Sequence, residues 1–387
     1  AVTLSANRVT AAATGNNLTT GIASGTGSAL FDGSATLANR QVNGDGIYAF
    51  SVTANTTTTT IAATVGDAIN GTVSGSSVGM DANIVASSAV GSRAVQTIDL
   101  SAATVTTSAG YATVAFDRAP DAATEEIIST DGAVTIANRQ LNQLAPVTAN
   151  TTATSITLTS NDFADVTANS QLSVTNNIQQ AYAAGSDSAN AVSLAGTTVG
   201  SGVGVANSQR NGDSSSTVSA TTTGSAYLVI TDSLGNGAAG ASAALTGNRT
   251  DALATGVTTA NTLNVDAQTV AYNGAATGGQ TLDLTGTGTV TAAYALFNEQ
   301  AVLGAVTATS TPATGKSAFL LSIGNAVNTG STVDNNSNTL TAKAQGALSA
   351  NSNNLNIGGT LSNGTAAAGS IGKVAVIANV QSIAAGA

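Results

Sequence analysis

Two closely similar stretches determine how the rest of this chain is interpreted. They read Ala35-Thr-Leu-Ala-Asn-Arg-Gln41 and Val134-Thr-Ile-Ala-Asn-Arg-Gln140. Both alternate in the two-residue period of a β-strand, and both contain the element apolar-Ala-Asn-x-Gln. The element returns at Val205–Gln209 and at Ile377–Gln381. A strand element that recurs along a chain predicts an architecture of stacked repeats.

Looser copies of the element extend the pattern. They are found at Thr167–Gln171 and Leu296–Gln300, with a partial copy at Ser5–Arg8. Several separations between the Asn residues lie near roughly 32 residues or a multiple of it, which is a period typical of solenoid repeats, but the last two separations do not. A second element, Ala/Thr-x-Gly-polar, alternates irregularly with the first, for example at Gly15, Gly91 and Gly247. The pattern favours a solenoid whose coils differ in length.

The element has a physical rationale in such a stack. Coils of a β-solenoid lie about 4.8 Å apart, and Asn or Gln at one fixed position can form an amide ladder from coil to coil. Gly at another corner adopts positive φ without a steric cost. We therefore expect eight residues to occupy equivalent repeat corners: Asn39, Gln41, Asn138, Gln140, Asn207, Gln209, Asn379 and Gln381.

The predicted fold class is all-β. β-Branched residues and Gly interrupt almost every Ala-rich window, whereas runs such as Ser155–Ser160 alternate cleanly between turn residues. We expect an elongated β-solenoid-like or stacked-repeat rod, with a β-sandwich as the alternative. One elongated domain is expected over residues 1–387, with a loop insertion at the charged stretch 117–126.

Composition excludes several classes of function. The chain lacks Cys and His, which excludes disulfides, thiolate or imidazole zinc sites and Ser-His-Asp catalysis. A net charge of −10 without a basic cluster argues against nucleic acid as a partner. No apolar run approaches the ~18 residues of a membrane-spanning helix. We expect no cofactor, no metal and no membrane span.

The carboxylates are few and scattered, which argues against glycoside cleavage and calcium binding. Glu125 and Glu126 are adjacent and would point to opposite faces of a strand, so they are interpreted as part of a solvated loop. Asp81, Asp99 and Asp283 would bind Ca²⁺ only if the fold gathered them, because the sequence shows no calcium-loop motif. We therefore predict a protein that is not an enzyme.

The placement of threonine and arginine suggests two further features, an ice-binding face and a row of arginines along the rod. Rows such as Thr56–Thr60, Thr157/Thr159 and Thr285–Thr291 resemble the Thr-x-Thr faces of ice-binding solenoids, but these copies do not recur at one spacing, so β-propensity is the preferred explanation. Arginines beside the repeat elements either solvate turns or line one side of the rod, where they would pair with acidic groups: Arg8, Arg40, Arg139, Arg210 and Arg249.

The apolar-Ala-Asn-x-Gln elements, the Gly-Asn turns and the lack of Cys and His resemble holdfast-anchor and curlin-like fibre proteins of Proteobacteria. That resemblance implies an exported bacterial surface fibre or adhesin, and numbering from Ala1 suggests a removed leader. A homopolymer is expected, with surface polysaccharide as a further partner. Candidate inter-subunit strands contain Val2, Leu4, Val374 and Val376. The alternatives are a tail-fibre-like carbohydrate-binding protein and a polysaccharide-degrading solenoid enzyme.

Overall fold

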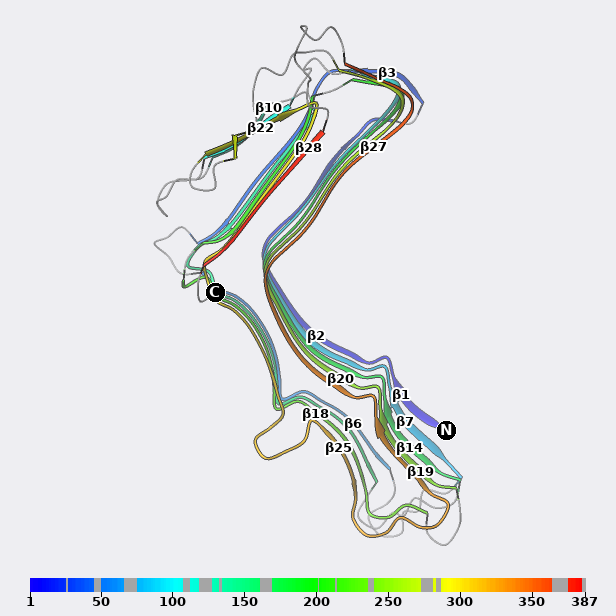
Figure 1. Ribbon diagram of the computed structural model, residues 1–387. Helices are drawn as coiled ribbons and strands as arrows, with labels where there is room; N and C mark the ends of the chain where they lie inside the picture. The colour runs from blue at the N-terminus through cyan, green and yellow to red at the C-terminus, as the bar shows by residue number, and fades with distance from the viewer. Residues whose placement is uncertain are drawn as a thin grey trace.

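The chain winds into a stack of parallel coils, and the predicted all-β solenoid is confirmed (Figure 1). Five parallel sheets run the length of the stack, so the sandwich alternative is wrong. The described part of the chain contains no helix. The computed structural model describes residues 1–25, 27–44, 50–65, 75–106, 112–117, 127–131, 134–160, 169–200, 202–212, 214–235, 240–272, 281–282, 287–363 and 375–384.

Each complete coil passes through five sheets, here numbered I to V in chain order, and the last described coil passes through sheets I to III. Sheet I contains β1 (Val2–Ser5), β7 (Ser77–Asp81), β14 (Gln171–Thr175), β19 (Ser242–Thr246) and β26 (Thr332–Asn336). Sheet II contains the long strands β2 (Arg8–Ala23), β8 (Ile84–Thr106), β15 (Ile178–Val199), β20 (Arg249–Tyr272) and β27 (Thr339–Asn363). The short strand β3 (Ser28–Asp32) pairs with the end of β8.

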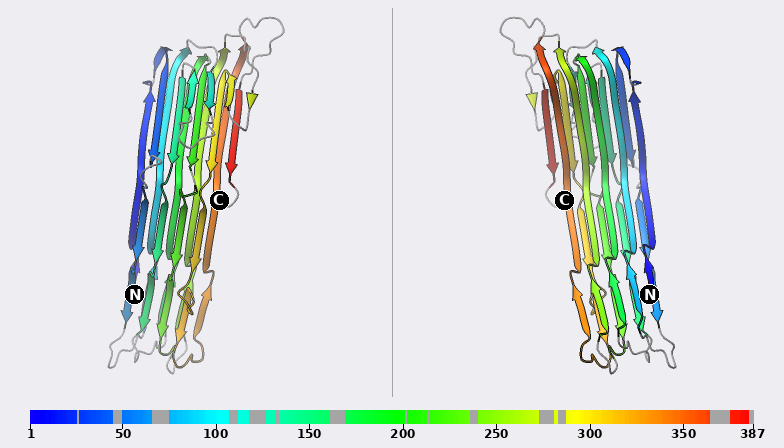
Figure 2. Two further views of the ribbon diagram at one scale, coloured as in Figure 1. Left: turned by 90° about the vertical axis from the view of Figure 1, so that its left-hand side faces the viewer. Right: turned by 90° about the vertical axis from the view of Figure 1, so that its right-hand side faces the viewer.

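The chain then returns along the opposite wall. Sheet III contains β4 (Ala35–Asn43), β11 (Val134–Asn142), β16 (Val203–Asn211), β23 (Tyr294–Val302) and β28 (Ala375–Ile383). Sheet IV contains β5 (Val52–Thr57), β12 (Val147–Thr152), β17 (Val218–Thr223) and β24 (Val306–Thr311). Sheet V contains β6 (Thr60–Val65), β13 (Ser155–Ser160), β18 (Ala226–Thr231) and β25 (Phe319–Ile323). Side views show the strands following chain order across each sheet (Figure 2).

A small antiparallel sheet lies beside sheet III. It contains β9 (Ala112–Asp117), β10 (Ile127–Asp131), β21 (Thr281–Leu282) and β22 (Thr287–Ala292). It packs over the outer side of sheet III, where Phe297 is fully buried with Ala206 and Ala295. The predicted loop insertion at 117–126 falls between β9 and β10, and apart from Asp117 it lies outside the described residues.

The repeat is much longer than the roughly 32 residues that the Asn spacing suggested. Equivalent Asn residues at the corner between sheets I and II are 76, 94, 71 and 90 residues apart. Two separations between the Asn residues, of 91 and 81 residues, already departed from that spacing, so the sequence alone left the repeat length open. One complete coil uses five strands. The strands pair in the same register from coil to coil, but the connections between them differ in length, so equivalent residues are not evenly spaced along the sequence.

The hydrophobic core is a thin layer between two walls. Sheet I faces sheet V around Met80, Leu158 and Tyr227. The C-terminal halves of the sheet II strands face sheet III around Leu100 and Ile136. Where sheet II faces sheet IV, the buried apolar side chains are only Ala and Val, and small polar side chains such as Ser87 and Thr151 are buried beside them, so the interior is narrow there. The abundance of Ala and Val in the sequence is thus a consequence of the flat cross-section.

A glycine column lies where sheet II bends towards sheet IV. In β8 the burial alternation breaks at Gly91 and Ser92, which are both buried. A Cβ on Gly15, Gly91, Gly185 or Gly256 would meet the carbonyl oxygen of the equivalent glycine in the next coil, far inside the 3.0 Å that real Cβ contacts respect. Only Gly allows the coils to stack at this bend, which divides the long wall in Figure 1.

Candidate functional site: amide ladders, open edges and a threonine face

An asparagine ladder runs through sheet III from the first coil to the last. Asn39 donates its amide to the Oδ1 of Asn138 over 2.6 Å, and Asn138 donates in the same way to Asn207 over 2.6 Å. Asn207 continues to Asn298 and Asn298 to Asn379, each over 2.7 Å. The three inner residues are fully buried. Because every donor points towards the next coil, the ladder has a direction.

A glutamine ladder runs beside it in the opposite direction. The Nε2 of Gln140 donates to Oε1 of Gln41 over 2.9 Å, and Gln209 donates to Gln140 over 2.9 Å. Gln300 and Gln381 add two further rungs, at 3.1 and 2.7 Å. The structure therefore brings all eight candidate repeat residues into two adjacent columns, together with Asn298 and Gln300.

These columns lie inside the strands of sheet III, not at corners, so the predicted corner placement is wrong. The corner between sheets I and II is occupied by a different column, which sequence reasoning missed: Asn7, Asn83, Asn177, Asn248 and Asn338. Asn7 belongs to this column and not to the sheet III ladder. Asn169 belongs to neither, because it lies at positive φ shortly before β14.

The corner column holds together a turn that would otherwise be strained. The residue before each Asn adopts positive φ, and only one of the five is Gly: Ala6, Ala82, Asn176, Gly247 and Ser337. The Oδ1 of Asn177 accepts both the backbone N–H and the side-chain amide of Asn83, over 2.9 and 2.8 Å. Left-handed non-Gly residues cost about 1–2 kcal/mol each, which these bonds offset. The recurring signal was a small or polar residue followed by Asn at a strand start.

A third amide column in sheet II faces the sheet III ladder across the interior. Asn190 donates to Asn261 over 2.8 Å, and it also reaches Oδ1 of Asn207 in the opposite wall over 3.2 Å. The same position in β8 is Gln96, whose buried side-chain amide has no hydrogen-bond partner among the described residues. The two walls are thus joined by polar as well as apolar contacts.

The exposed large apolar side chains of the described residues are confined to the two ends of the stack. At the first coil they are Val2, Val9, Leu30 and Phe50. On the last strands of the sheets, or close to them, they are Leu320, Val327, Val333, Leu340, Leu348, Leu361, Ile377 and Ile383. For the side chains that point inwards, the equivalent residues between the ends, such as Val78 and Ile136, are buried, whereas Leu320 and Leu348 lie in outward-facing columns. Both ends also present the backbone edge of each sheet.

The predicted inter-subunit residues lie on these edges where the structure describes them. Val2 and Leu4 are on β1, which pairs only with β7. Val376 is on β28, which pairs only with β23. Val374 lies outside the described residues. No helix in the described residues is long and apolar enough to cross a membrane.

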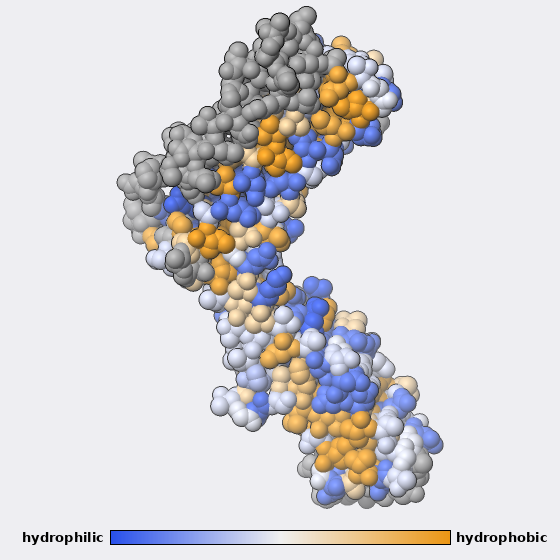
Figure 3. Space-filling view, in the orientation of Figure 1, coloured by the Kyte–Doolittle hydropathy of each residue, from blue (hydrophilic) through white to orange (hydrophobic). Residues whose placement is uncertain are grey.

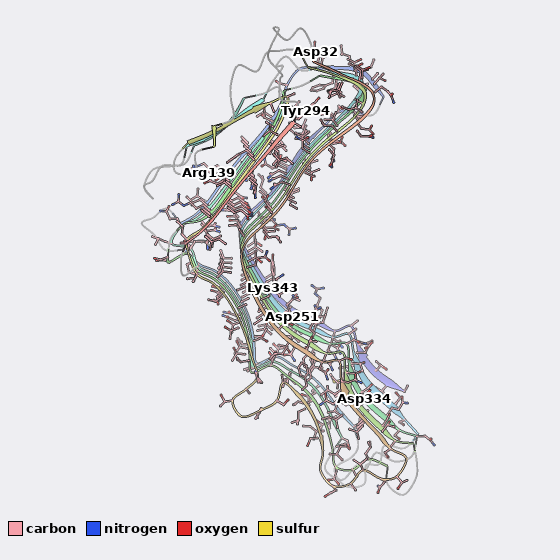
Figure 4. The ribbon with its side chains drawn as sticks, viewed as in Figure 1. Asp32, Arg139, Asp251, Tyr294, Asp334 and Lys343 are labelled. Atoms are coloured by element: carbon pink, nitrogen blue, oxygen red, sulfur yellow. The ribbon has the colours of Figure 1, made fainter. Side chains whose placement is uncertain are left out.

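Charged groups are dispersed over the molecule. Arg8 and Arg249 share a column of sheet II, whereas Arg40, Arg139 and Arg210 are on sheet III, so the arginines do not line one side. Figure 4 shows Arg139 on the outer side of sheet III and Tyr294 between sheets II and III.

Carboxylates are equally dispersed. Asp81 accepts hydrogen bonds from Thr175 and Asn176 in sheet I, and Asp99 is exposed on sheet II. Asp283, Glu125 and Glu126 lie outside the described residues. Within the described ranges, no three acidic side chains group together as metal ligands would.

One ion pair shows how desolvation acts on the outer face of sheet II. Arg93 Nε lies 3.7 Å from Asp187 Oδ2 in the neighbouring coil. Burial raises the pKa of the Asp187 carboxyl, and the Arg93 guanidinium lowers that pKa only in part. Burial also raises the pKa of the nearby Tyr182 hydroxyl. This isolated pair resembles a structural contact more than a catalytic centre.

The outer side of sheet IV carries a regular array that we call the threonine face. Three outward positions recur in register in each of its four strands, and nine of the twelve residues are Thr: Thr53, Asn55, Thr57, Thr148, Asn150, Thr152, Ser219, Thr221, Thr223, Thr307, Thr309 and Thr311. The conclusion that Thr rows do not recur from coil to coil is therefore wrong for this sheet. Variable coil length concealed the register.

Comparison with known proteins gives no relative for this chain. No family model matches it, and neither a curated protein nor a solved structure matches it. Its function is therefore inferred from its own residues.

Proposed function

We propose that the protein is a non-enzymatic structural subunit that stacks end to end into an extracellular filament, or a fibrous adhesin, of a bacterial surface. The observation that carries this proposal is the confinement of exposed large apolar side chains to the two ends of the stack. Soluble monomers rarely expose large apolar patches, and natural sheet edges are usually guarded by charges such as Lys. Here the open edges carry few charges, such as Arg8 on β2 and Lys343 on β27, and apolar side chains lie on the same strands.

If the observed strand register continues from one copy to the next, apolar side chains of one copy contact apolar side chains of the other. The column that contains Val2 ends at Val333, so a second copy would set its Val2 on Val333. By the same extension Val9 meets Leu340. Leu37 meets Ile377. The contacts of Val2 and Leu37 repeat apolar packing between coils that already exists within the chain, whereas the column of Val9 also contains Gln179 and Thr250.

The amide ladders favour the same head-to-tail direction. Asn379 accepts from Asn298 and has its own Nδ2 on the outer side of the stack, while Asn39 has its Oδ1 on the opposite end. Stacking supplies each with the partner that inner rungs have. The glutamine ladder, which runs the other way, is completed as well, because Gln381 offers Oε1 to Gln41 of the next copy. A head-to-head joint would set acceptor against acceptor in the asparagine column and donor against donor in the glutamine column.

The joint would be formed by sheets I, II and III. These sheets contain five strands each, and β1, β2 and β4 offer 4, 16 and 9 residues for pairing. Sheets IV and V contain four strands, so the joint is one strand short there. Parallel pairing through the long strand of sheet II would give the joint most of its backbone hydrogen bonds.

Charge at the edge provides the test. Leu340→Lys with Ile377→Lys would bury two ammonium groups in the joint, while Thr97→Lys places one ammonium group on an exposed inner-coil position. Electron microscopy should show fibres for the parent and for Thr97→Lys, and single short rods for the edge variant. Fibres of equal length in all three proteins would refute end-to-end stacking.

A further inference from the structure

The threonine face is hollowed rather than flat. Sheet IV bows inwards towards sheet II in Figure 1, and the outline of the molecule recedes on that side in Figure 3, which looks along the stack. The rows of the face run parallel to the stack axis. One row is threonine in all four coils: Thr57, Thr152, Thr223 and Thr311. The result is a shallow trough along the rod with a step of about 4.8 Å between coils.

The chemistry of the trough is uniform. All twelve outward side chains carry a hydroxyl or an amide, and none is charged. The only hydrogen bond between them in the described structure joins Asn150 to Asn55. None of the threonine hydroxyls in the face has a partner among the described residues, so each can both donate and accept. The outer face of sheet II differs, because it carries Arg93, Asp187 and Lys343.

These features select among ligands. A bowed surface matches a crystal plane such as ice poorly, because a flat lattice would touch only the rims of the trough. An acidic polymer would find no positive charge there. Protein partners are usually anchored by Trp, Tyr or Arg, and the face has none. A neutral polymer rich in hydroxyl groups satisfies the donors and acceptors, and its C–H groups pack against the threonine methyls.

We propose that the threonine face binds a neutral polysaccharide chain lying along the stack axis, with successive coils contacting successive parts of the polymer. The proposal is independent of end-to-end assembly, because one copy already offers four coils of the face. Assembly would raise the avidity of binding by presenting several troughs to one polymer, without any new contact.

Affinity electrophoresis tests the proposal with defined polymers. Native gels contain hydroxyethyl cellulose or dextran as neutral polymers, or polygalacturonate as the acidic one. The test variant replaces four hydroxyls by methyls and keeps the β-branch: Thr148→Val, Thr152→Val, Thr221→Val and Thr223→Val. The matched control makes four equivalent changes on the outer face of sheet II: Thr19→Val, Thr97→Val, Thr255→Val and Thr258→Val. Circular dichroism confirms that both variants remain folded.

We expect at least one neutral polymer to retard the parent and the control, and the test variant to bind about tenfold or more weakly, since four lost hydrogen bonds exceed the 1.4 kcal/mol of a tenfold change. Retardation by polygalacturonate alone, equal retardation of test variant and parent, or no retardation by either neutral polymer would overturn the proposal. Inhibition of ice recrystallisation that is lost in the test variant, without polymer binding, would assign the face to ice instead. Fibre formation by the test variant bears only on the assembly proposal.

Discussion

Replacing Asn207 by Leu removes a residue that forms hydrogen bonds with both walls of the solenoid. Asn207 is fully buried and takes part in four hydrogen bonds. Its Oδ1 accepts from Asn138 at 2.6 Å, from Ser188 at 3.1 Å and from Asn190 at 3.2 Å, and its amide donates to Asn298. Leu has a similar volume, so the change removes polar contacts without creating a large cavity.

The expected loss in the free energy of unfolding depends on which hydrogen bonds the four partners of Asn207 retain. Ser188 and Asn190 retain bonds to Thr259 and Asn261, and Asn298 still accepts from Asn261. The buried amide of Asn138 loses its acceptor entirely. Four net bonds at about 1 kcal/mol each, partly compensated by burying the apolar Leu, give an expected loss of about 3 kcal/mol in the free energy of unfolding.

Urea unfolding followed by circular dichroism measures this loss. It is best measured in the Leu340→Lys, Ile377→Lys background, so that assembly does not contribute. The control is Asn55→Ala, which removes one exposed ladder bond to Asn150 and should cost about 0.5 kcal/mol or less. Because solenoid stability is a sum over neighbouring coils, hydrogen exchange should rise most in β11, β16 and β23. An Asn207→Leu loss no larger than that of Asn55→Ala would refute the ladder as a stabilising element.

Two further predictions concern the bend of sheet II. Gly185→Ala should lower the free energy of unfolding by several kcal/mol or prevent folding, because its Cβ meets the backbone carbonyl of Gly256, whereas Gly25→Ala has open space and should cost little; equal thermal stability of the two variants would contradict the glycine column. Asp187→Asn should stabilise the protein at pH 7. Burial raises the pKa of the Asp187 carboxyl in the folded state, so this carboxyl contributes stability below its ordinary pKa of 3.8. That contribution is lost as pH rises through the raised pKa, and Asn avoids the loss. That gain should vanish in unfolding measurements below pH 3.8, and a gain that grows on acidification would show the sign to be wrong.

The sequence was sufficient for the fold class and for one pair of rungs. Leu37–Gln41 and Ile136–Gln140 are nearly identical, and they lie side by side in sheet III. Alternation between turn residues predicted the strands. Such local sequence patterns recur because equivalent positions of successive coils lie in the same environment.

The rest could not be predicted, because register in a solenoid is set by contacts between coils and not by spacing along the chain. Asn7 and Asn169 matched the element locally but belong to different positions of the coil. Ala6 and Ser337 occupy left-handed corners where Gly was expected, because the following Asn stabilises the turn. The threonine face was missed for the same reason, since its equivalent residues are separated by connections of different lengths.

Cryo-electron microscopy of the assembled chain tests end-to-end stacking most directly. If each copy continues the five-stranded sheets I to III of its neighbour, the axial rise per subunit is five coil steps of about 4.8 Å, or about 24 Å. The map should show Val2 of one copy beside Val333 of the next, with strands perpendicular to the fibre axis. A chain that remains single at high concentration, or a fibre whose subunits meet through the outer faces of sheets II or IV, would contradict the account.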